Sequence, residues 1–222
     1  MDRKYYEAYD ARYKTAHENS VRWLGDEPSP IVSEVIERYG ITKDSSLLEL
    51  GCGEGRDAIM LLKNGYDLTA TDISPEAIRY CTELLPSSKD SFAVLDCVRG
   101  KCDKKFDFIY SVAVIHMLVD DCDREAFYRF IREHLTQNGI SLICTMGDGE
   151  TERQSDTSRA FELQEREEQG KKLLVAGTSC RMVSKKNFEK ELTSAGFEII
   201  ECSKTEIPVI FPVMMYAVVK NK

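Results

Sequence analysis

The segment Leu47-Leu48-Glu49-Leu50-Gly51-Cys52-Gly53-Glu54-Gly55-Arg56 passes from apolar residues into three alternating glycines. An apolar strand that runs through glycines into a helix allows the backbone to approach a ligand closely at the carboxyl edge of a sheet. We therefore expect a strand at residues 47–50, a tight glycine turn, and a helix from Arg56 to Asn64. The turn is the first candidate for a binding site.

The spacing between this turn and the next acidic residue at a strand end is informative. Asp72 ends the next apolar run and lies 72 − 53 = 19 residues after Gly53, close to the spacing of ~20 at which a carboxylate reaches ribose hydroxyls. The glycines read Gly-x-Gly-x-Gly, whereas the dinucleotide fingerprint reads Gly-x-Gly-x-x-Gly, and no Gly-Lys-Ser/Thr phosphate loop is present. Glu54 in the turn would also repel a pyrophosphate. The pattern favours a nucleoside that carries a cationic or zwitterionic tail.

The rest of the chain alternates short β-branched runs with amphipathic helical patterns, which is typical of a mostly parallel sheet. Helices are expected to begin at Ser29-Pro30, Ser74-Pro75 and Ser184, and another ends at Asn138-Gly139. The predicted strands are residues 47–50, 67–71, 91–95, 106–112, 140–145, 197–202 and 211–219. A short connection joins the last two, so the final strand should be antiparallel. We predict an α/β fold: a doubly wound, seven-stranded, mostly parallel Rossmann-like sheet with an antiparallel last strand and helices on both faces.

Two segments depart from this alternation within what we expect to be a single domain, residues 1–222. Residues 1–28 are predicted to form an N-terminal cap, with a helix that carries Tyr6, Tyr9 and Tyr13, and Trp23 is either a lid contact or an anchor. Residues 147–183 are polar and are predicted to be an inserted, lid-like segment. Glu162 and Arg166 have the spacing of a helical ion pair there, and Asp148, Glu150, Arg153 and Arg181 are candidate acceptor contacts.

Composition excludes several classes of function. The 222 residues carry a formal net charge of −8, and an acidic chain without a basic stripe is poorly suited to nucleic acid. No apolar run has the ~20 residues of a membrane helix, and no signal peptide is visible, so a cytoplasmic protein without membrane contact is expected. The eight cysteines are scattered and form no Cys-x-x-Cys, which favours reduced thiols and no metal site. We expect a monomer or homodimer that acts on a small-molecule acceptor.

The motifs resemble those of the class I S-adenosylmethionine-dependent methyltransferases. Residues 48–55 look like the first family motif and Thr71-Asp72-Ile73-Ser74 like the second, while Asp96-Cys97 and residues 106–111 fall where later motifs fall. Gly55-Arg56-Asp57 and the stretch from Asn64 to Ala70 are most similar to the small-molecule branch that includes tellurite-resistance and thiopurine methyltransferases. The resemblance covers residues 31–146 well and implies an S-adenosylmethionine-dependent methyltransferase of small molecules.

The resemblance also implies roles for individual residues. Gly51, Cys52 and Gly53 would form the turn under the amino-acid portion of the cofactor, Glu49 would orient its ammonium, and the Ser111 carbonyl would accept from that ammonium. Asp72 would bind the ribose hydroxyls. Ile73, Asp96 and Cys97 would surround the adenine. Residues Tyr9 to Tyr13 resemble a Trp-x-x-x-Trp helix that closes over the cofactor in the thiopurine branch, which makes Tyr13 a candidate contact.

Methyl transfer from a sulfonium needs positioning more than acid or base catalysis. If a base is used, His116 is our candidate, because it follows the fourth strand at the edge where the methyl group should point. The alternative for His116 is a structural role in a helix start. Two alternatives for the whole chain also stand at this stage: a nicotinamide-dependent oxidoreductase, and a non-catalytic S-adenosylmethionine-binding module.

Overall fold

A seven-stranded sheet forms the centre of the computed structural model, which describes residues 3–23, 25, 27–207 and 211–222. Its strand order is β10-β11-β5-β4-β1-β2-β3. The strands are β1 (Ser46–Leu50), β2 (Asp67–Asp72), β3 (Phe92–Val94), β4 (Phe106–Val112), β5 (Leu135–Met146), β10 (Phe197–Ile207) and β11 (Phe211–Asn221). β11 is antiparallel to both β10 and β5, and the other pairs are parallel. The predicted doubly wound, Rossmann-like sheet with an antiparallel last strand is confirmed.

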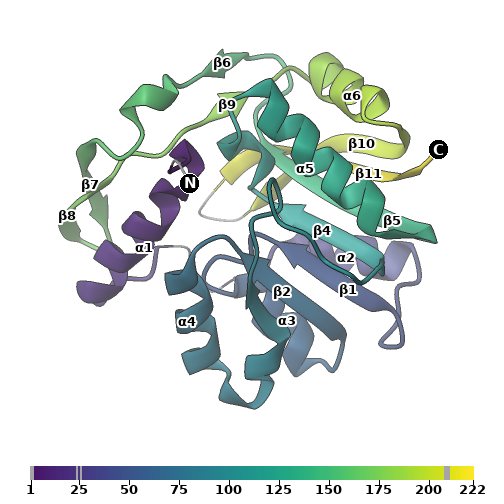
Figure 1. The fold of residues 1–222 in the computed structure, drawn as a ribbon, viewed down its shortest axis with the longest axis horizontal. Coiled ribbons are helices and arrows are strands. Elements are labelled where there is room, and N and C mark those ends of the chain that lie inside the picture. The colour runs from purple at the N-terminus through teal and green to yellow at the C-terminus, as the bar shows by residue number, and fades with distance from the viewer. Residues whose placement is uncertain (1–2, 24, 26, 208–210) are drawn as a thin grey trace.

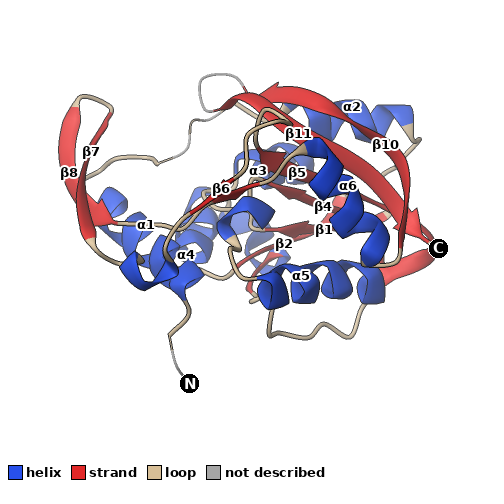
Figure 2. Ribbon diagram, turned by 90° about the horizontal axis from the view of Figure 1, so that it is seen from above, coloured by secondary structure: helices blue, strands red, loops and turns tan. Residues whose placement is uncertain are grey.

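Helices cover both faces of this sheet, as predicted (Figure 2). One core cluster joins the sheet to α2 (Pro30–Arg38), α3 (Arg56–Lys63) and α4 (Pro75–Leu84), and the other joins it to α5 (Asp121–His134) and α6 (Lys185–Ser194). Within β1, Leu47 belongs to the first cluster and Leu48 to the second, because successive side chains of a strand point to opposite faces. Both faces of the sheet are therefore apolar and buried.

The caps predicted from the sequence explain where the helices begin. α2 and α4 both start with proline after a serine, where the missing amide hydrogen costs no helical bond. Ser74 Oγ also accepts a hydrogen bond from the Ala77 amide at 3.1 Å. The Ser184 side chain caps α6 in the same manner, through Asn187. In α4, these local signals place the start of the helix directly after the carboxyl end of β2.

The predicted end of α5, at Asn138-Gly139, lies too far along the chain. The helix stops at His134, and β5 begins at Leu135 rather than Ile140. Leu135 pairs with Phe106 of β4, and Thr136 Oγ1 donates to Asp107 at 3.0 Å. A Cβ at Gly139 would lie 2.9 Å from the Phe106 carbonyl. Residues 135–139 are thus held in an extended conformation by contacts with β4, which outweigh their own turn-forming tendency.

The segment from 147 to 183 forms β structure, so the helical interpretation of Glu162 and Arg166 was wrong. β6 (Arg153–Gln154) pairs with β9 (Arg181–Met182), and β7 (Leu163–Glu168) forms a hairpin with β8 (Lys171–Ala176). Gln169 and Gly170 make the turn, both with positive φ, which is the backbone of a two-residue type I′ turn. Arg166 therefore pairs with Leu173 across the hairpin.

The N-terminal helix α1 (Ala8–Glu18) lies beside this hairpin and apart from the central sheet (Figure 1). A small apolar cluster joins them, made of Ala16 and Val21 on one side and Leu173 and Val175 on the other. α1 and the hairpin together cover the carboxyl ends of the central strands. Among the described residues no helix has the length and hydropathy needed to cross a bilayer.

Candidate functional site

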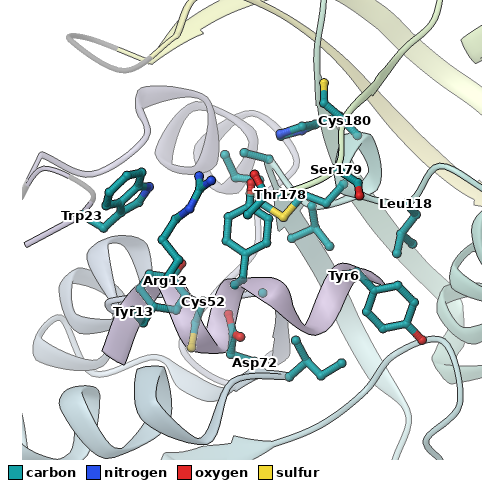
Figure 3. Close-up of a pocket in the computed structure, with 18 of the residues that line it drawn as sticks. Tyr6, Arg12, Tyr13, Trp23, Cys52, Asp72, Leu118, Thr178, Ser179 and Cys180 are labelled. Carbon is teal, nitrogen blue, oxygen red and sulfur yellow. The ribbon is translucent and has the colours of Figure 1, made fainter. Parts of the chain in front are cut away.

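A cavity of about 1120 Å³ lies at the carboxyl ends of β1, β2 and β4, beneath α1 and the 147–183 segment (Figure 3). Most of the residues singled out in the sequence line it: Tyr13, Glu49, Gly51, Cys52, Asp72, Ile73, Asp96, Cys97 and His116. Gly53 and Ser111 do not. Residues that are up to 103 positions apart in the chain (116 − 13) thus meet at one place.

The glycine turn has the backbone geometry that its sequence predicts. Gly51, Gly53 and Gly55 all have positive φ, at 79°, 53° and 79°, a conformation that costs other residues about 1–2 kcal/mol. A Cβ at Gly51 would lie 2.2 Å from Cγ2 of Val114. The turn is therefore closed to side chains at Gly51, and it leaves bare backbone at the floor of the cavity.

Asp72 is attached directly to this turn. Its Oδ2 accepts a hydrogen bond from the Gly53 amide at 2.9 Å, and its Oδ1 accepts from the Ser74 amide at 2.8 Å. Burial raises the pKa of Asp72, and the two amides partly oppose that rise. Gly53 thus contributes through its amide although it does not face the cavity. The carboxylate is held rigidly at the end of β2, with 7% of the residue exposed.

Glu49 is a buried acid at the inner end of the cavity. Burial raises the pKa of Glu49 well above its ordinary value, and the nearby Asp57 raises it further. Its Oε2 atom has no partner at hydrogen-bond distance in the described part of the chain, although the Tyr110 hydroxyl lies near enough to oppose the rise in the pKa of Glu49. A buried acceptor without a donor is costly. The atom is suited to receive a hydrogen bond from a ligand that enters the cavity.

Asp96, Cys97 and Ile73 form a separate part of the cavity wall, after β2 and β3. Asp96 Oδ1 accepts from the Val98 amide at 2.9 Å, and Oδ2 receives the Arg99 Nε at 2.6 Å and the Tyr6 hydroxyl at 3.4 Å. Burial raises the pKa of the Cys97 thiol, so it remains a neutral, apolar surface. This wall combines one anchored carboxylate with apolar side chains.

At the end of β4, the residues that line the cavity differ from the residue predicted from the sequence. Ser111 is fully buried in the strand, and Val112 and Ala113 line the cavity instead. Ala113 has a positive φ of 62°, which is uncommon for a residue with a Cβ and often occurs at functional sites. β4 ends at Val112, so its last residue and the first residue after the strand reach the cavity.

His116 lies in a 3₁₀ turn, η3 (Ile115–Met117), and lines the cavity. Burial lowers the pKa of His116 to about 4, and the nearby Arg124 guanidinium acts in the same direction. Arg124 supports the turn, since its Nη1 donates to the Ile115 carbonyl at 2.7 Å and the Leu118 carbonyl at 3.0 Å. The imidazole is therefore neutral at physiological pH and can accept a proton.

Two sets of contacts made by α1 near the cavity were not predicted from the sequence. Arg12 is buried, lines the cavity and donates two hydrogen bonds to the Ala176 carbonyl, at 3.0 and 2.8 Å. Its guanidinium also lies over the Trp23 ring, 4.7 Å from the centroid (Figure 3). His17 bridges Glu54 and Glu76. Periodicity alone would not have found them, because their partners belong to distant segments.

Glu54 also has a different environment from the one assumed. Its side chain is fully buried, faces His17, and accepts from the Trp23 amide at 2.8 Å. Glu54 does not line the cavity. Because His17 of α1 faces this carboxylate, Glu54 would not repel a pyrophosphate in the cavity, and that interpretation of the sequence was wrong. The glycine spacing remains the feature that distinguishes this turn from the dinucleotide fingerprint.

Of the charged candidates in the 147–183 segment, Arg153 lines the cavity, together with Arg166 and Glu168 of β7. Arg181 points elsewhere: its Nη1 donates to the Val119 carbonyl at 2.8 Å and lies 2.5 Å from Asp121 Oδ1. Asp148 and Glu150 are not part of the cavity wall, and Asp148 instead binds the amides of Glu150 and Thr151.

No group of three or more His, Cys, Asp or Glu side chains within the described ranges is arranged to hold a metal ion. All eight cysteines, each of them in the described part of the chain, are without a disulfide partner. His134, which the sequence places on an apolar helical face, contacts the Phe130 and Cys102 carbonyls at 2.6 and 2.8 Å. Its contacts belong to the core, not to the cavity.

Comparisons with known proteins agree with this geometry. A family model described as a methyltransferase domain matches residues 23–202. A protein of Haemophilus influenzae described as a probable S-adenosyl-L-methionine-dependent methyltransferase, TehB, is 28% identical over 115 residues, which are 51% of this chain and 40% of that protein. The chain thus matches less than half the length of that relative.

Two solved structures share the fold. The CcbJ methyltransferase from Streptomyces caelestis superposes with a TM-score of 0.71 at 13% identity, and the match covers 99% of each chain. The glycopeptide N-methyltransferase MtfA in complex with S-adenosyl-L-methionine superposes with a TM-score of 0.65 at 22% identity, covering 90% of this chain and 96% of that one. The resemblance read from the sequence motifs is confirmed.

Proposed function

Since this chain belongs to the methyltransferase-domain family, as an S-adenosylmethionine-dependent member, we propose that it transfers the methyl group of S-adenosylmethionine to a small-molecule acceptor. The observation that carries the proposal is that one cavity is lined both by the motif residues Gly51 and Asp72 and by the lid-like segment. Cofactor and acceptor would share this enclosed space. The family assignment replaces the nicotinamide oxidoreductase alternative.

The residues present fit the proposed cofactor. Asp72 offers two anchored carboxylate oxygens for a pair of vicinal hydroxyls. The unpartnered Oε2 of Glu49 suits an ammonium, and bare glycine backbone at Gly51 gives room for the amino-acid portion. Ile73 and Cys97 offer an apolar surface for a purine ring, with Asp96 as an acceptor for its amino group. The carbonyl of Val112 or Ala113 takes the place proposed earlier for Ser111.

The bound cofactor supplies an electrophilic methyl group on a sulfonium. The protein's contribution is positioning, and holding two reactants in line is worth up to ~7–11 kcal/mol. His116 lies at the cavity wall in its neutral form, so its imidazole is available to accept a proton that the acceptor loses. Arg124 holds the turn that presents it. A general base is most efficient when its pKa lies near the operating pH, and the pKa of His116 is about 4, so proton transfer to His116 is secondary to positioning.

The size of the cavity and its outer wall support a small acceptor. The outer wall consists of α1 and residues 153–180, which include Arg153, Arg166 and Thr178. We propose that residues 147–183 act as the lid predicted from the sequence. MtfA, which shares this fold, is named as a glycopeptide N-methyltransferase, so the fold can serve an acceptor of that size. The net charge of −8 disfavours a polyanionic acceptor such as RNA.

The experiment is methyl transfer from S-adenosyl[methyl-³H]methionine to an extract of the host cell, separated afterwards by size. We expect a labelled product in the small-molecule fraction, separated from unreacted S-adenosylmethionine by chromatography. It should appear with the wild-type protein but not with Asp72→Asn or with extract alone, since that variant loses the anchored carboxylate. Label in protein or RNA would contradict the small-molecule proposal. Cofactor binding without any labelled product would favour the non-catalytic binding module.

A further inference from the structure

His17 lies between two carboxylates where α1 meets the nucleotide-binding half of the sheet. Its Nε2 is 2.9 Å from Glu54 Oε1 and its Nδ1 is 2.7 Å from Glu76 Oε1. The ring stacks on Tyr80, with 4.2 Å between the ring centroids. A neutral imidazole has only one N–H to donate, whereas the imidazolium has two. Two carboxylate partners therefore require the protonated form.

Each of the two carboxylates that contact His17 also has an arginine nearby. Arg79 Nη2 lies 2.5 Å from Glu76 Oε1, the same oxygen that faces His17, and Arg22 Nε lies 4.0 Å from Glu54 Oε2. The titratable neighbours on the ring faces are Tyr80 of α4 and Tyr13 of α1. Burial alone would lower the pKa of His17, but its hydrogen bonds with Glu54 and Glu76 raise it above the ordinary value.

The contact between His17 and Glu54 bears on the cavity because Glu54 belongs to the glycine turn. Its carboxylate is fully buried, and a buried charge is stable only when it is paired. On α1, Tyr13 lies one helical turn before His17 and projects into the cavity with 4% exposure. Asp72 is among the charges that raise the pKa of Tyr13, so the phenol and the ribose-binding carboxylate are neighbours (Figure 3).

Resting on the proposed function, we propose that protonated His17 is a positioning residue: it pins α1 to the glycine turn and thereby holds Tyr13 over the cofactor beside Asp72. Nothing in His17 touches the reacting atoms. Its effect is on cofactor affinity, through the place of α1. After it loses the proton, the His17 ring can donate a hydrogen bond to only one of Glu54 and Glu76. The end of α1 near Glu18 is then held less tightly.

Loosening would be local, because other contacts hold the first half of α1. Asp10 Oδ1 accepts from Ser74 Oγ at 2.7 Å and from the Glu76 amide at 3.2 Å. Arg12 holds the helix to the hairpin through the Ala176 carbonyl. Deprotonation of His17 should therefore weaken ligand binding without unfolding the protein.

The test measures dissociation constants from pH 5.5 to 9 for S-adenosylhomocysteine and for 5′-methylthioadenosine. The second ligand lacks the amino-acid portion and so adds no titrating group of its own in this range. We expect the affinity of the wild-type protein for 5′-methylthioadenosine to fall about tenfold as pH rises through the pKa of His17, the equivalent of one pKa unit. His17→Gln should bind weakly with no such pH dependence.

Two further variants keep the test decisive. Glu76→Gln removes one of the two carboxylates, so the fall in affinity should move to lower pH. His134→Gln is the matched control, because His134 is buried but contacts carbonyls outside the cavity, and it should follow the wild-type profile. If His17→Gln fails to fold in a thermal melt, Glu76→Gln alone decides the question.

Imidazole NMR measures the protonation state of His17 directly, and a merely structural role would not require the protonated form. The chain has three histidines, so each variant identifies one resonance, and His17 should titrate above pH 6.5. A His17 resonance that is neutral at pH 6, or identical profiles for wild type and His17→Gln, would overturn the His17 proposal. Failure of the wild-type protein to bind S-adenosylhomocysteine at any pH would instead overturn the proposed function.

Discussion

The backbone amide of Gly53 donates a hydrogen bond to Oδ2 of Asp72 across a distance of 2.9 Å. This bond joins the glycine turn after β1 to the end of β2, two elements that are neighbours in the parallel sheet. The Ser74 amide holds the other carboxylate oxygen at 2.8 Å. The carboxylate is thus oriented before a ligand binds, which lowers the cost of ordering it on binding.

Gly51→Ala tests the close approach at the floor of the cavity. The new Cβ would lie 2.2 Å from Val114 Cγ2 at a φ of 79°, so we expect a loss of stability of about 1–3 kcal/mol. Affinity for S-adenosylhomocysteine should fall by at least about tenfold, equivalent to ~1.4 kcal/mol. Urea unfolding and calorimetry measure the two effects.

Gly40→Ala is the matched control for that variant, because Gly40 has a φ of 65° but no atom within 4 Å of the added Cβ. It should cost stability alone and leave affinity unchanged. Adding Val114→Ala to Gly51→Ala should recover part of the affinity that Gly51→Ala alone loses, because it removes the atom that the new Cβ meets. Normal binding by Gly51→Ala would show that the cofactor does not pass over this turn.

His116→Gln tests the neutral state of the imidazole through stability. The folded-state pKa of about 4 lies below the ordinary 6.5, so the folded protein binds fewer protons than the unfolded chain between these values. His116 therefore contributes stability that is present above pH 6.5 and is lost as pH falls toward 4, in total about 3 kcal/mol. Between pH 7.5 and pH 5, the wild-type protein should lose more unfolding free energy than His116→Gln. Equal losses would mean that His116 is not shielded from water.

Arg124→Met tests the support of the His116 turn. Arg124 donates to the Ile115 and Leu118 carbonyls and also pairs with Glu191 of α6, 2.6 Å from Oε2. Its removal takes the guanidinium from Glu191, which keeps the Tyr128 hydroxyl at 2.8 Å, and from two carbonyls, at a cost of about 3–5 kcal/mol for a buried pair. Chemical denaturation should report this cost. Arg129→Met, on the exposed face of the same helix, should change stability by less than about 0.5 kcal/mol.

The fold and the cofactor half of the site could be predicted because their signals are local. Residues 47–56 contain a strand, a turn and a helix start in sequence, and Asp72 follows at the distance that one βαβ unit sets. The serine-proline pairs mark two helix starts for similar reasons. In each case, the residues that decide the structure lie within a few positions of one another.

Pairing between distant segments could not be predicted in the same way. The contact of His17 with Glu54 depends on the packing of α1 against the glycine turn. The β7–β8 hairpin has a charged sequence whose spacing also suits a helix, and its apolar contact with α1 decides in favour of strands. The early start of β5 at Leu135 likewise depends on its partner Phe106.

The most direct test of the account is the affinity of wild type and Asp72→Asn for S-adenosylhomocysteine, measured by isothermal titration calorimetry. We predict one binding site in the wild-type protein and a loss of roughly 100-fold in the folded variant, because the two charge-assisted hydrogen bonds that we propose between Asp72 and the ribose would be worth about 3 kcal/mol or more. Asp44→Asn, an exposed acid, should bind as wild type does. Equal affinity of Asp72→Asn and wild type would contradict the assignment of this cavity to the cofactor.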